Sequence, residues 1–217
     1  MKIESLVDIA TRYIEELIIT GKLNPGEQIK EDIIAGQLDI SRPPVREALN
    51  SLEGEGLVTR RPRKGAFVSE MTEKDIWEIY TLKAELYAMA TDWAIDRITQ
   101  EQIDELNSLV VLMGINSRPA QDVILNYQKH HRAFHTRIME IAGNHRLVKF
   151  ASSLHKQIRR YSFKTLGYED HLNRSNQYHR QIAVHIAQKD KENAGKLMKE
   201  HVLDAMNFLL KTPGIFV

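Results

Sequence analysis

The feature that most restricts the fold of this chain is an unbroken order of structural signals between residues 41 and 68. Ser41 is a suitable N-cap, and the prolines at 43 and 44 fall in a first helical turn, where a missing N–H costs nothing. Apolar spacing continues this helix to about Gly54 or Gly56. Two short β-runs follow, LVTR and AFV, joined by the basic turn RPRKG. This order predicts a helix that leads into a small hairpin.

The residues before Ser41 supply the rest of a known motif. Apolar residues between Leu6 and Ile18 recur at helical spacing, and Gly21 follows as a stop signal. Pro25–Gly26 forms a turn, and a short helix is expected at about 31–38. Two helices, a turn, a third helix and a hairpin, in that order, predict a winged helix-turn-helix.

From residue 71 onward the apolar pattern is helical throughout. We expect helices at roughly 73–96, 100–115, 119–142, 145–164, 170–188 and 190–211. The expected breaks are Ser117–Pro119, Gly143–Asn144, Gly167 and Lys189–Asp190, and Thr99 heads a capping box. The predicted fold class is therefore mainly α: an N-terminal winged helix-turn-helix over 1–70, then an all-α bundle of about six helices over 71–217.

Composition narrows the possible functions. The net charge is only +1 over 217 residues, so any affinity for nucleic acid must come from a local patch. There is no cysteine, which excludes disulfides and thiolate metal sites. The N-terminus shows no signal-peptide pattern, and no stretch approaches the roughly 20 apolar residues of a membrane span. We expect a cytoplasmic protein without a membrane partner.

Positive charge is concentrated where a DNA-binding domain would use it. Residues 40–66 hold six Lys or Arg against three Asp or Glu, whereas the first 39 residues hold four against eight. Arg42 and Arg46 are one turn apart, so they share a face of the predicted recognition helix and can reach base edges in a major groove. Arg63 and Lys64 lie in the wing turn. The alternative is that these cations only decorate a solvated helix; the complete order of turn, cap, helix and basic wing favours DNA binding.

The stretch from Gly21 to Val68 resembles the DNA-binding domain of the GntR family of bacterial transcriptional regulators, through PGE, SRPPVREAL, EGLV and GAFV. The resemblance implies DNA contacts by Ser41, Arg42, Pro44 and Arg46, with the wing around Lys64 and Gly65. It also implies a homodimer on a short palindrome of double-stranded DNA. Asp32 departs from relatives that place a basic residue there, so the half-site sequence stays open.

Four histidines of the predicted bundle lie on apolar helix faces. His131 and His135 are one turn apart on one helix, and His179 and His201 lie on two later helices. Each alone could be a hydrogen-bonded core histidine. Several buried imidazoles in one interior are hard to satisfy unless a divalent metal organises them.

The segments around these histidines resemble the FCD domain, the C-terminal ligand-binding and dimerisation domain of the FadR subfamily. Metal-binding members use an Asp and a His four apart, then two later histidines. The matching positions are His131, His135, His179 and His201, and His131 departs from the usual Asp or Asn. An all-imidazole set favours Zn²⁺, with Ni²⁺ and Cu²⁺ also suitable, over Mn²⁺.

The same resemblance places Lys83 where the family often has an Arg, and Tyr87 where it often has a Glu. Lys83 could pair with an effector carboxylate, but an exposed surface lysine is the expected alternative. Arg159 is a second candidate contact, on another helix.

Three functions are compatible with these patterns. The first is a dimeric repressor controlled by a small anion, such as an organic acid, bound beside the metal. The second is a regulator whose effector is the metal itself. The third is a metalloenzyme, against which no Glu or Asp at the matched positions offers a general base. We therefore expect no enzyme.

Overall fold

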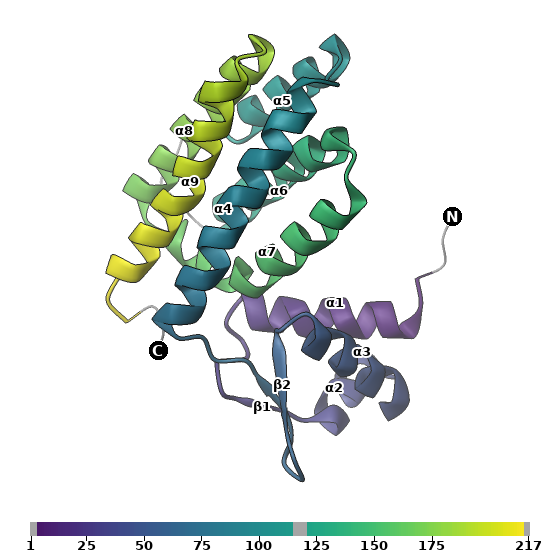
Figure 1. Cartoon of the computed structure of the whole chain (residues 1–217). Coiled ribbons are helices and arrows are strands. Elements are labelled where there is room, and N and C mark those ends of the chain that lie inside the picture. The colour runs from purple at the N-terminus through teal and green to yellow at the C-terminus, as the bar shows by residue number, and fades with distance from the viewer. Residues whose placement is uncertain (1–3, 115–120, 215–217) are drawn as a thin grey trace. The chain divides into compact units, whose positions relative to one another are not determined.

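The computed structural model describes residues 4–114 and 121–214. Over these residues the chain forms nine helices and one three-stranded sheet (Figure 1). It divides into two compact units, the first built mostly from residues up to Thr72 and the second mostly from residues after it. None of the described helices is long and apolar enough to cross a membrane. The expected fold class, mainly α with a small N-terminal sheet, is confirmed.

The first unit is a winged helix-turn-helix. Its elements are α1 (Leu6–Ile19), β1 (Gln28–Ile29), α2 (Glu31–Leu38), α3 (Arg42–Gly54), β2 (Val58–Arg61) and β3 (Gly65–Val68). Both α1 and α2 pack against α3. Ile14 of α1, Ile34 of α2 and Leu49 of α3 are among the apolar side chains of its buried core. The core therefore fixes α3 and leaves the opposite side of that helix in solvent.

The start of α3 shows how its prolines act. The backbone of Ser41 has N-cap geometry, with φ −73° and ψ 163°, but its side chain makes no capping hydrogen bond. An N-cap side chain accepts from the N–H of the second or third helical residue. Those residues are Pro43 and Pro44, which have no N–H. The prolines set the helical φ and leave the Ser41 hydroxyl without a capping bond.

The sheet contains one strand that the sequence did not indicate. β3 lies between β1 and β2 and is antiparallel to both. β2 and β3 are the two predicted β-runs, but β1 has only two residues, with Ile29 opposite Ala66. Two residues are too few for an alternating pattern, so β1 exists because of its partner and not because of local preference.

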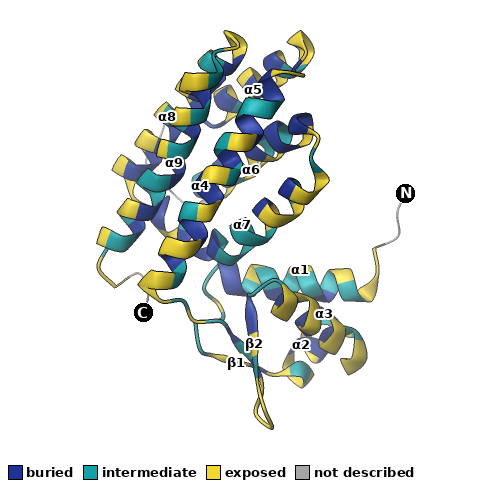
Figure 2. Ribbon diagram, in the orientation of Figure 1, coloured by how far each residue is buried: buried dark blue, intermediate teal, exposed yellow. Residues whose placement is uncertain are grey.

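The second unit is the predicted bundle. Its helices are α4 (Glu73–Ile95), α5 (Gln100–Leu112), α6 (Gln121–Ala142), α7 (His145–Thr165), α8 (Glu169–Ala187) and α9 (Lys191–Lys211). α4 packs against α9 and α6, while α8 packs against α9 and α5. Buried and exposed residues alternate along these helices (Figure 2).

The expected helix limits agree with the structure to within a few residues. The capping box is present: the Gln102 N–H donates to Thr99 Oγ1 at 3.3 Å, and the Thr99 N–H donates to Gln102 Oε1 at 3.1 Å. Gly143 has φ +70°, as a residue that ends a helix often does. The predicted break at Ser117–Pro119 lies outside the described residues.

Candidate functional site

The exposed side of α3 carries the two arginines that the sequence singled out. Arg42 and Arg46 are both exposed, while Val45 and Leu49 on the other side of the helix are buried. Their spacing of one turn places them on a shared face. Ser41 and Pro44 lie beside them at the start of the helix. The structure thus brings the exposed Ser41, Arg42 and Arg46 together at the start of α3, with the half-buried Pro44 in the same turn.

The predicted wing residues form the turn between β2 and β3. Arg63, Lys64 and Gly65 are all exposed. The Lys64 N–H donates to the carbonyl of Arg61 at 3.0 Å, and Gln28 Nε2 donates to the carbonyl of Lys64 at 2.6 Å. Arg63 and Gly65 have positive φ, +60° and +92°, and at Gly65 only glycine adopts this conformation without strain. The turn is therefore closed and tied to β1, with its cations in solvent.

Sequence reasoning missed the hydrogen-bond and ion-pair partners of two arginines in the first unit, Arg46 and Arg60. Arg46 donates to Glu31, the first residue of α2, through three N–O contacts of 2.9–3.3 Å. Arg60 donates to Asn50 Oδ1 at 2.6 Å and pairs with Glu53 at 3.4 Å. The three contacts join residues 15, 10 and 7 positions apart on different elements, so helical spacing does not predict them.

The four predicted histidines meet inside the second unit. His131 and His135 come from α6, His179 from α8 and His201 from α9. All are at most 9% exposed. One ring nitrogen of each lies within 4.8 Å of those of the others, and Nε2 of His135 is 3.0 Å from Nε2 of His179. We call these four residues the histidine cluster.

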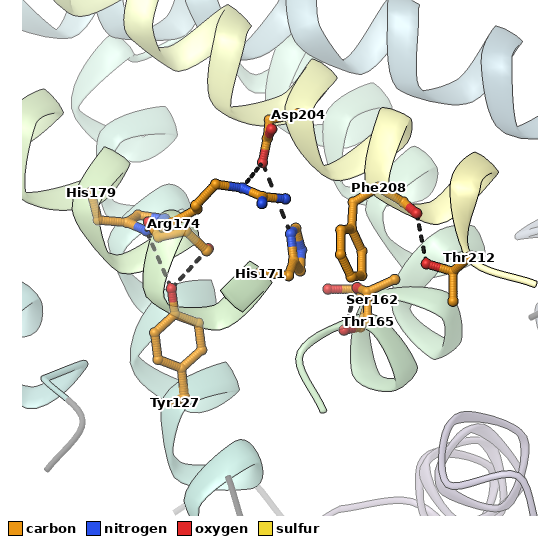
Figure 3. A network of polar contacts seen from close by, with 10 residues as sticks. Tyr127, Ser162, Thr165, His171, Arg174, His179, Asp204, Phe208 and Thr212 are labelled. Atoms are coloured by element: carbon orange, nitrogen blue, oxygen red, sulfur yellow. Dashed lines mark hydrogen bonds and ion pairs between the residues drawn. The ribbon is translucent and has the colours of Figure 1, made fainter. Parts of the chain in front are cut away.

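A polar chain behind the cluster fixes the ring of His179 (Figure 3). Its Nδ1 lies 2.5 Å from the carbonyl oxygen of Ser175. Because a carbonyl oxygen can only accept, Nδ1 carries the proton and Nε2 presents its lone pair to the cluster. The Tyr127 hydroxyl donates to Ser175 Oγ at 2.8 Å, so α6 and α8 are joined at this point. Such outer contacts are typical of metal-binding histidines.

The electrostatics of the cluster favour neutral rings. Burial is the main cause that lowers the pKa of His131, His135 and His201 well below the ordinary value, and it lowers that of His179 to about 4. Neutral imidazoles keep the lone pairs that a metal requires. His135 Nδ1 is buried and has no hydrogen-bond partner among the described residues.

The arrangement fits a divalent ion. Two nitrogens that share one zinc at about 2.0–2.1 Å lie at most about 4.2 Å apart, close to the spacing found here. Without an ion, the two facing Nε2 atoms of His135 and His179 can share only a single proton. The donor set therefore suits a borderline-soft ion such as zinc.

Lys83 corrects one expectation. It is not a surface lysine: it is only 6% exposed, on α4. Its Nζ lies 4.5 Å from the ring centroid of Tyr87 and 5.7 Å from that of Tyr80. Burial lowers the pKa of Lys83 to about 7. The sequence could not show this, because a lysine next to tyrosines on a helix fits either a surface or an interior.

Lys83 is also close to the histidine cluster. The ring of Tyr87, which it contacts, lies 5.1 Å from that of His135. The charge of Lys83 contributes to the lowered pKa of all four cluster histidines. No acidic side chain pairs with Lys83 in the described part of the chain. A buried cation without a counter-ion is costly, and an anion would offset that cost.

The second candidate effector contact is less well placed. Arg159 lies on α7, a helix that contributes no side chain to the histidine cluster, and its side chain is 30% exposed.

A separate buried group, centred on His171, was not singled out from the sequence. His171 stacks on Phe208 at 4.4 Å between centroids, and its Nδ1 is 3.9 Å from Asp204 Oδ2 (Figure 3).

Comparison with known families matches both units. Residues 7–68 match the family of bacterial regulatory proteins described as the gntR family. Residues 78–204 match the FCD domain. Together the two matches cover most of the chain.

Named relatives and solved structures agree with these matches. The chain is 28% identical over 198 residues to the HTH-type transcriptional repressor GlaR of Escherichia coli, covering 88% of this chain and 90% of that protein. It is 29% identical over 161 residues to the Nta operon transcriptional regulator of Aminobacter aminovorans, covering 72% of this chain and 75% of that protein. The structure of E. coli McbR/YncC superimposes with a TM-score of 0.80 at 22% identity, covering 95% of this chain and 98% of that one. That likeness concerns the fold.

Proposed function

We propose that this chain, which belongs to the GntR family and is a DNA-binding transcriptional regulator with an FCD domain, acts as a repressor. A small organic acid would control its binding to DNA. It would bind a palindromic double-stranded operator as a homodimer, with α3 of each copy in a major groove. Its place of action would be the cytoplasm, where bacterial DNA lies.

The DNA contacts follow from the exposed surface of the first unit. Arg42 and Arg46 would reach base edges or phosphates. The Ser41 hydroxyl, which the prolines leave without a capping bond, would donate to a phosphate at the start of α3, with Pro44 packed beside the backbone. In the wing, Arg63 and Lys64 would follow the DNA backbone, and Gly65 would permit the close approach of the turn.

The histidine cluster would hold one divalent ion, with zinc the first choice and nickel the second. Its ligands would be His131, His135, His179 and His201. When bound, the ion would supply a positive charge that attracts an anionic ligand. The carbonyl of Ser175 fixes the tautomer of His179 by accepting a hydrogen bond from its Nδ1. The Tyr127 hydroxyl donates to Ser175 Oγ and so fixes the position of Ser175. The surrounding burial keeps water from competing.

The observation that carries the effector proposal is the burial of Lys83 beside the histidine cluster, with no acidic partner among the described residues. An ion and a lysine in one apolar interior both attract an anion, so a small carboxylate bridging them would neutralise the site. Arg159 remains a second candidate contact. A ligand can release DNA only if it prefers one dimer geometry, and couplings of about 1–3 kcal/mol are typical.

The experiment for the DNA half is selection of duplexes from a random pool by the full-length protein, followed by affinity measurements on the enriched sequence. We expect a palindrome, and a loss of at least about tenfold in affinity in Arg42→Ala and in Arg46→Ala. A pool that shows no enriched sequence would contradict the proposal.

A second candidate function is favoured by the same cluster. Four imidazoles could make the ion itself the effector, as in a metal-responsive regulator. Operator affinity titrated with Zn²⁺ alone separates the two functions. A large change without any organic acid would favour the metal sensor, and a change that needs the acid as well would favour the metabolite-responsive repressor.

A further inference from the structure

We propose that Glu31 is a positioning residue for Arg46, and that it raises the preference of the protein for its operator over other DNA. The proposal rests on the proposed function, in which α3 is the recognition helix. Glu31 does not itself lie on α3; it is the first residue of α2. Its role would be to fix the direction in which a DNA-reading side chain points.

The geometry of the pair is that of a clamp. Arg46 Nε lies 3.3 Å from Glu31 Oε1 and 3.2 Å from Oε2, and Arg46 Nη2 lies 2.9 Å from Oε2. The Glu31 side chain is 22% exposed and that of Arg46 is 58% exposed. A carboxylate in the first turn of a helix is also favoured by the helix dipole. The more buried and better anchored partner therefore holds the more exposed one.

The clamp leaves the reading end of the guanidinium open. A guanidinium has five N–H donors, and Glu31 occupies the edge formed by Nε and Nη2. The Nη1 hydrogens and one Nη2 hydrogen stay available, and two parallel donors at that end match O6 and N7 of a guanine. An arginine already held in this direction loses less rotamer freedom on binding than a free one.

The negative charge of Glu31 has a second effect. Its pKa is lowered, first by the hydrogen bond from Arg46 and further by the charges of Arg60 and Arg42. Glu31 is therefore ionised and offsets part of the positive charge of this surface. Phosphate attraction supplies most of the affinity for random DNA, so the pair weakens that binding while keeping the guanine contact.

Arg42 provides the contrast. It is exposed and has no hydrogen bond or ion pair in the part of the chain that the structure describes. A free cation of this kind can bind any phosphate within reach. The two arginines would then have different tasks: Arg42 would supply general attraction, and Arg46 would supply base discrimination.

The test measures the affinity of the full-length protein for two duplexes of equal length, the sequence enriched by selection and a scrambled version of it. Glu31→Gln should lower the ratio of the two affinities about tenfold, with weaker operator binding, tighter scrambled-DNA binding and a steeper salt dependence. Thermal unfolding of each variant checks that the fold is retained.

Asp39→Asn is the matched control, because Asp39 follows α2 as its C-cap, is exposed, and its side chain has no partner among the described residues. It removes the same charge without opening the clamp. Both affinities should rise by a similar factor, so their ratio should stay constant. A Glu31→Gln variant that behaves like Asp39→Asn would overturn the proposal.

A double-mutant cycle separates positioning from a general structural role. In an Arg46→Ala background, Glu31→Gln should leave the affinity ratio unchanged, since there is no guanidinium left to position. An equal loss in that background would overturn the positioning role. If selection enriches no sequence at all, the proposed function fails on that result, before Glu31 is tested.

Discussion

His135 on α6 and His179 on α8 present their Nε2 atoms to each other at 3.0 Å, across 44 positions of sequence. Both rings are buried, and His179 is fixed by the carbonyl of Ser175 on its own helix. Two lone pairs directed into one buried space require a proton or an ion between them. This pair is therefore the centre of the candidate metal site, and the other two histidines complete it.

Substitution of His135 should affect metal binding more than substitution of His131. His135 makes the short contact with His179, whereas the His131 ring lies against the ring of Tyr127 at 5.7 Å. We expect His135→Ala to weaken zinc binding about 100-fold or more and His131→Ala to weaken it less. Calorimetric titration of chelator-stripped protein checks this. Wild-type affinity in His131→Ala would exclude His131 from the ligands.

Tyr127→Phe should lower metal affinity although it replaces none of the four candidate ligands. The change removes the hydroxyl that donates to Ser175, and Ser175 holds His179. Losses of about 10–100-fold are typical for such outer contacts. Tyr80→Phe is the control, because Tyr80 is equally buried but lies on α4 against Lys83. Equal zinc affinities in the two variants would show that the Tyr127 hydroxyl does not support the site.

Lys83→Met should stabilise the fold and abolish the response to an acid. Methionine fills a similar volume without a buried charge, and replacement of buried ion pairs by apolar side chains often stabilises by about 1–4 kcal/mol. Chemical denaturation measures the free energy of unfolding. Lys74→Met, at an exposed position of the same helix, should change it little. If Lys83→Met is strongly destabilised, the lysine has a favourable partner that the present structure does not show.

His171 should make stability depend on pH. Burial lowers the pKa of His171 from 6.5 to about 4; the charge of Arg174 acts in the same direction, and the charge of Asp204 opposes it. As pH falls, the unfolded chain therefore takes up the proton first, and the folded state loses stability between about pH 6.5 and 4. The full effect is roughly 3 kcal/mol.

The His171→Asn variant isolates this contribution from that of the other histidines. Asparagine carries no titratable proton, so the fall in unfolding free energy between pH 7 and 4 should be smaller than in the wild type. Denaturation at matched pH values measures the difference. An identical slope in both proteins would mean that His171 titrates alike in the folded and unfolded states.

The limits of the helices followed closely from the sequence because each is marked locally. Thr99 and Gln102 satisfy each other across one turn, and the prolines after Arg42 fix the start of α3. The histidine cluster could be expected for a similar reason, since apolar spacing shows which face of each helix turns inward.

Features set by tertiary contacts could not be predicted. β1 has two residues and exists only through its pairing with β3. The Glu31–Arg46 clamp joins separate helices, and the burial of Lys83 depends on how α4 packs against α6 and α9. In each case the deciding partner is distant in the sequence, so local pattern gives no signal for it.

The central claim is that an ion in the histidine cluster and Lys83 together recognise an acid that controls DNA binding. Its most direct test is operator affinity by fluorescence anisotropy with zinc-loaded protein and a panel of small di- and tricarboxylates. We predict that at least one acid shifts the affinity about 5–150-fold, and that the shift disappears in zinc-stripped protein, in His135→Ala and in Lys83→Met. An affinity that no acid changes, or a shift of equal size in those three samples, would contradict it.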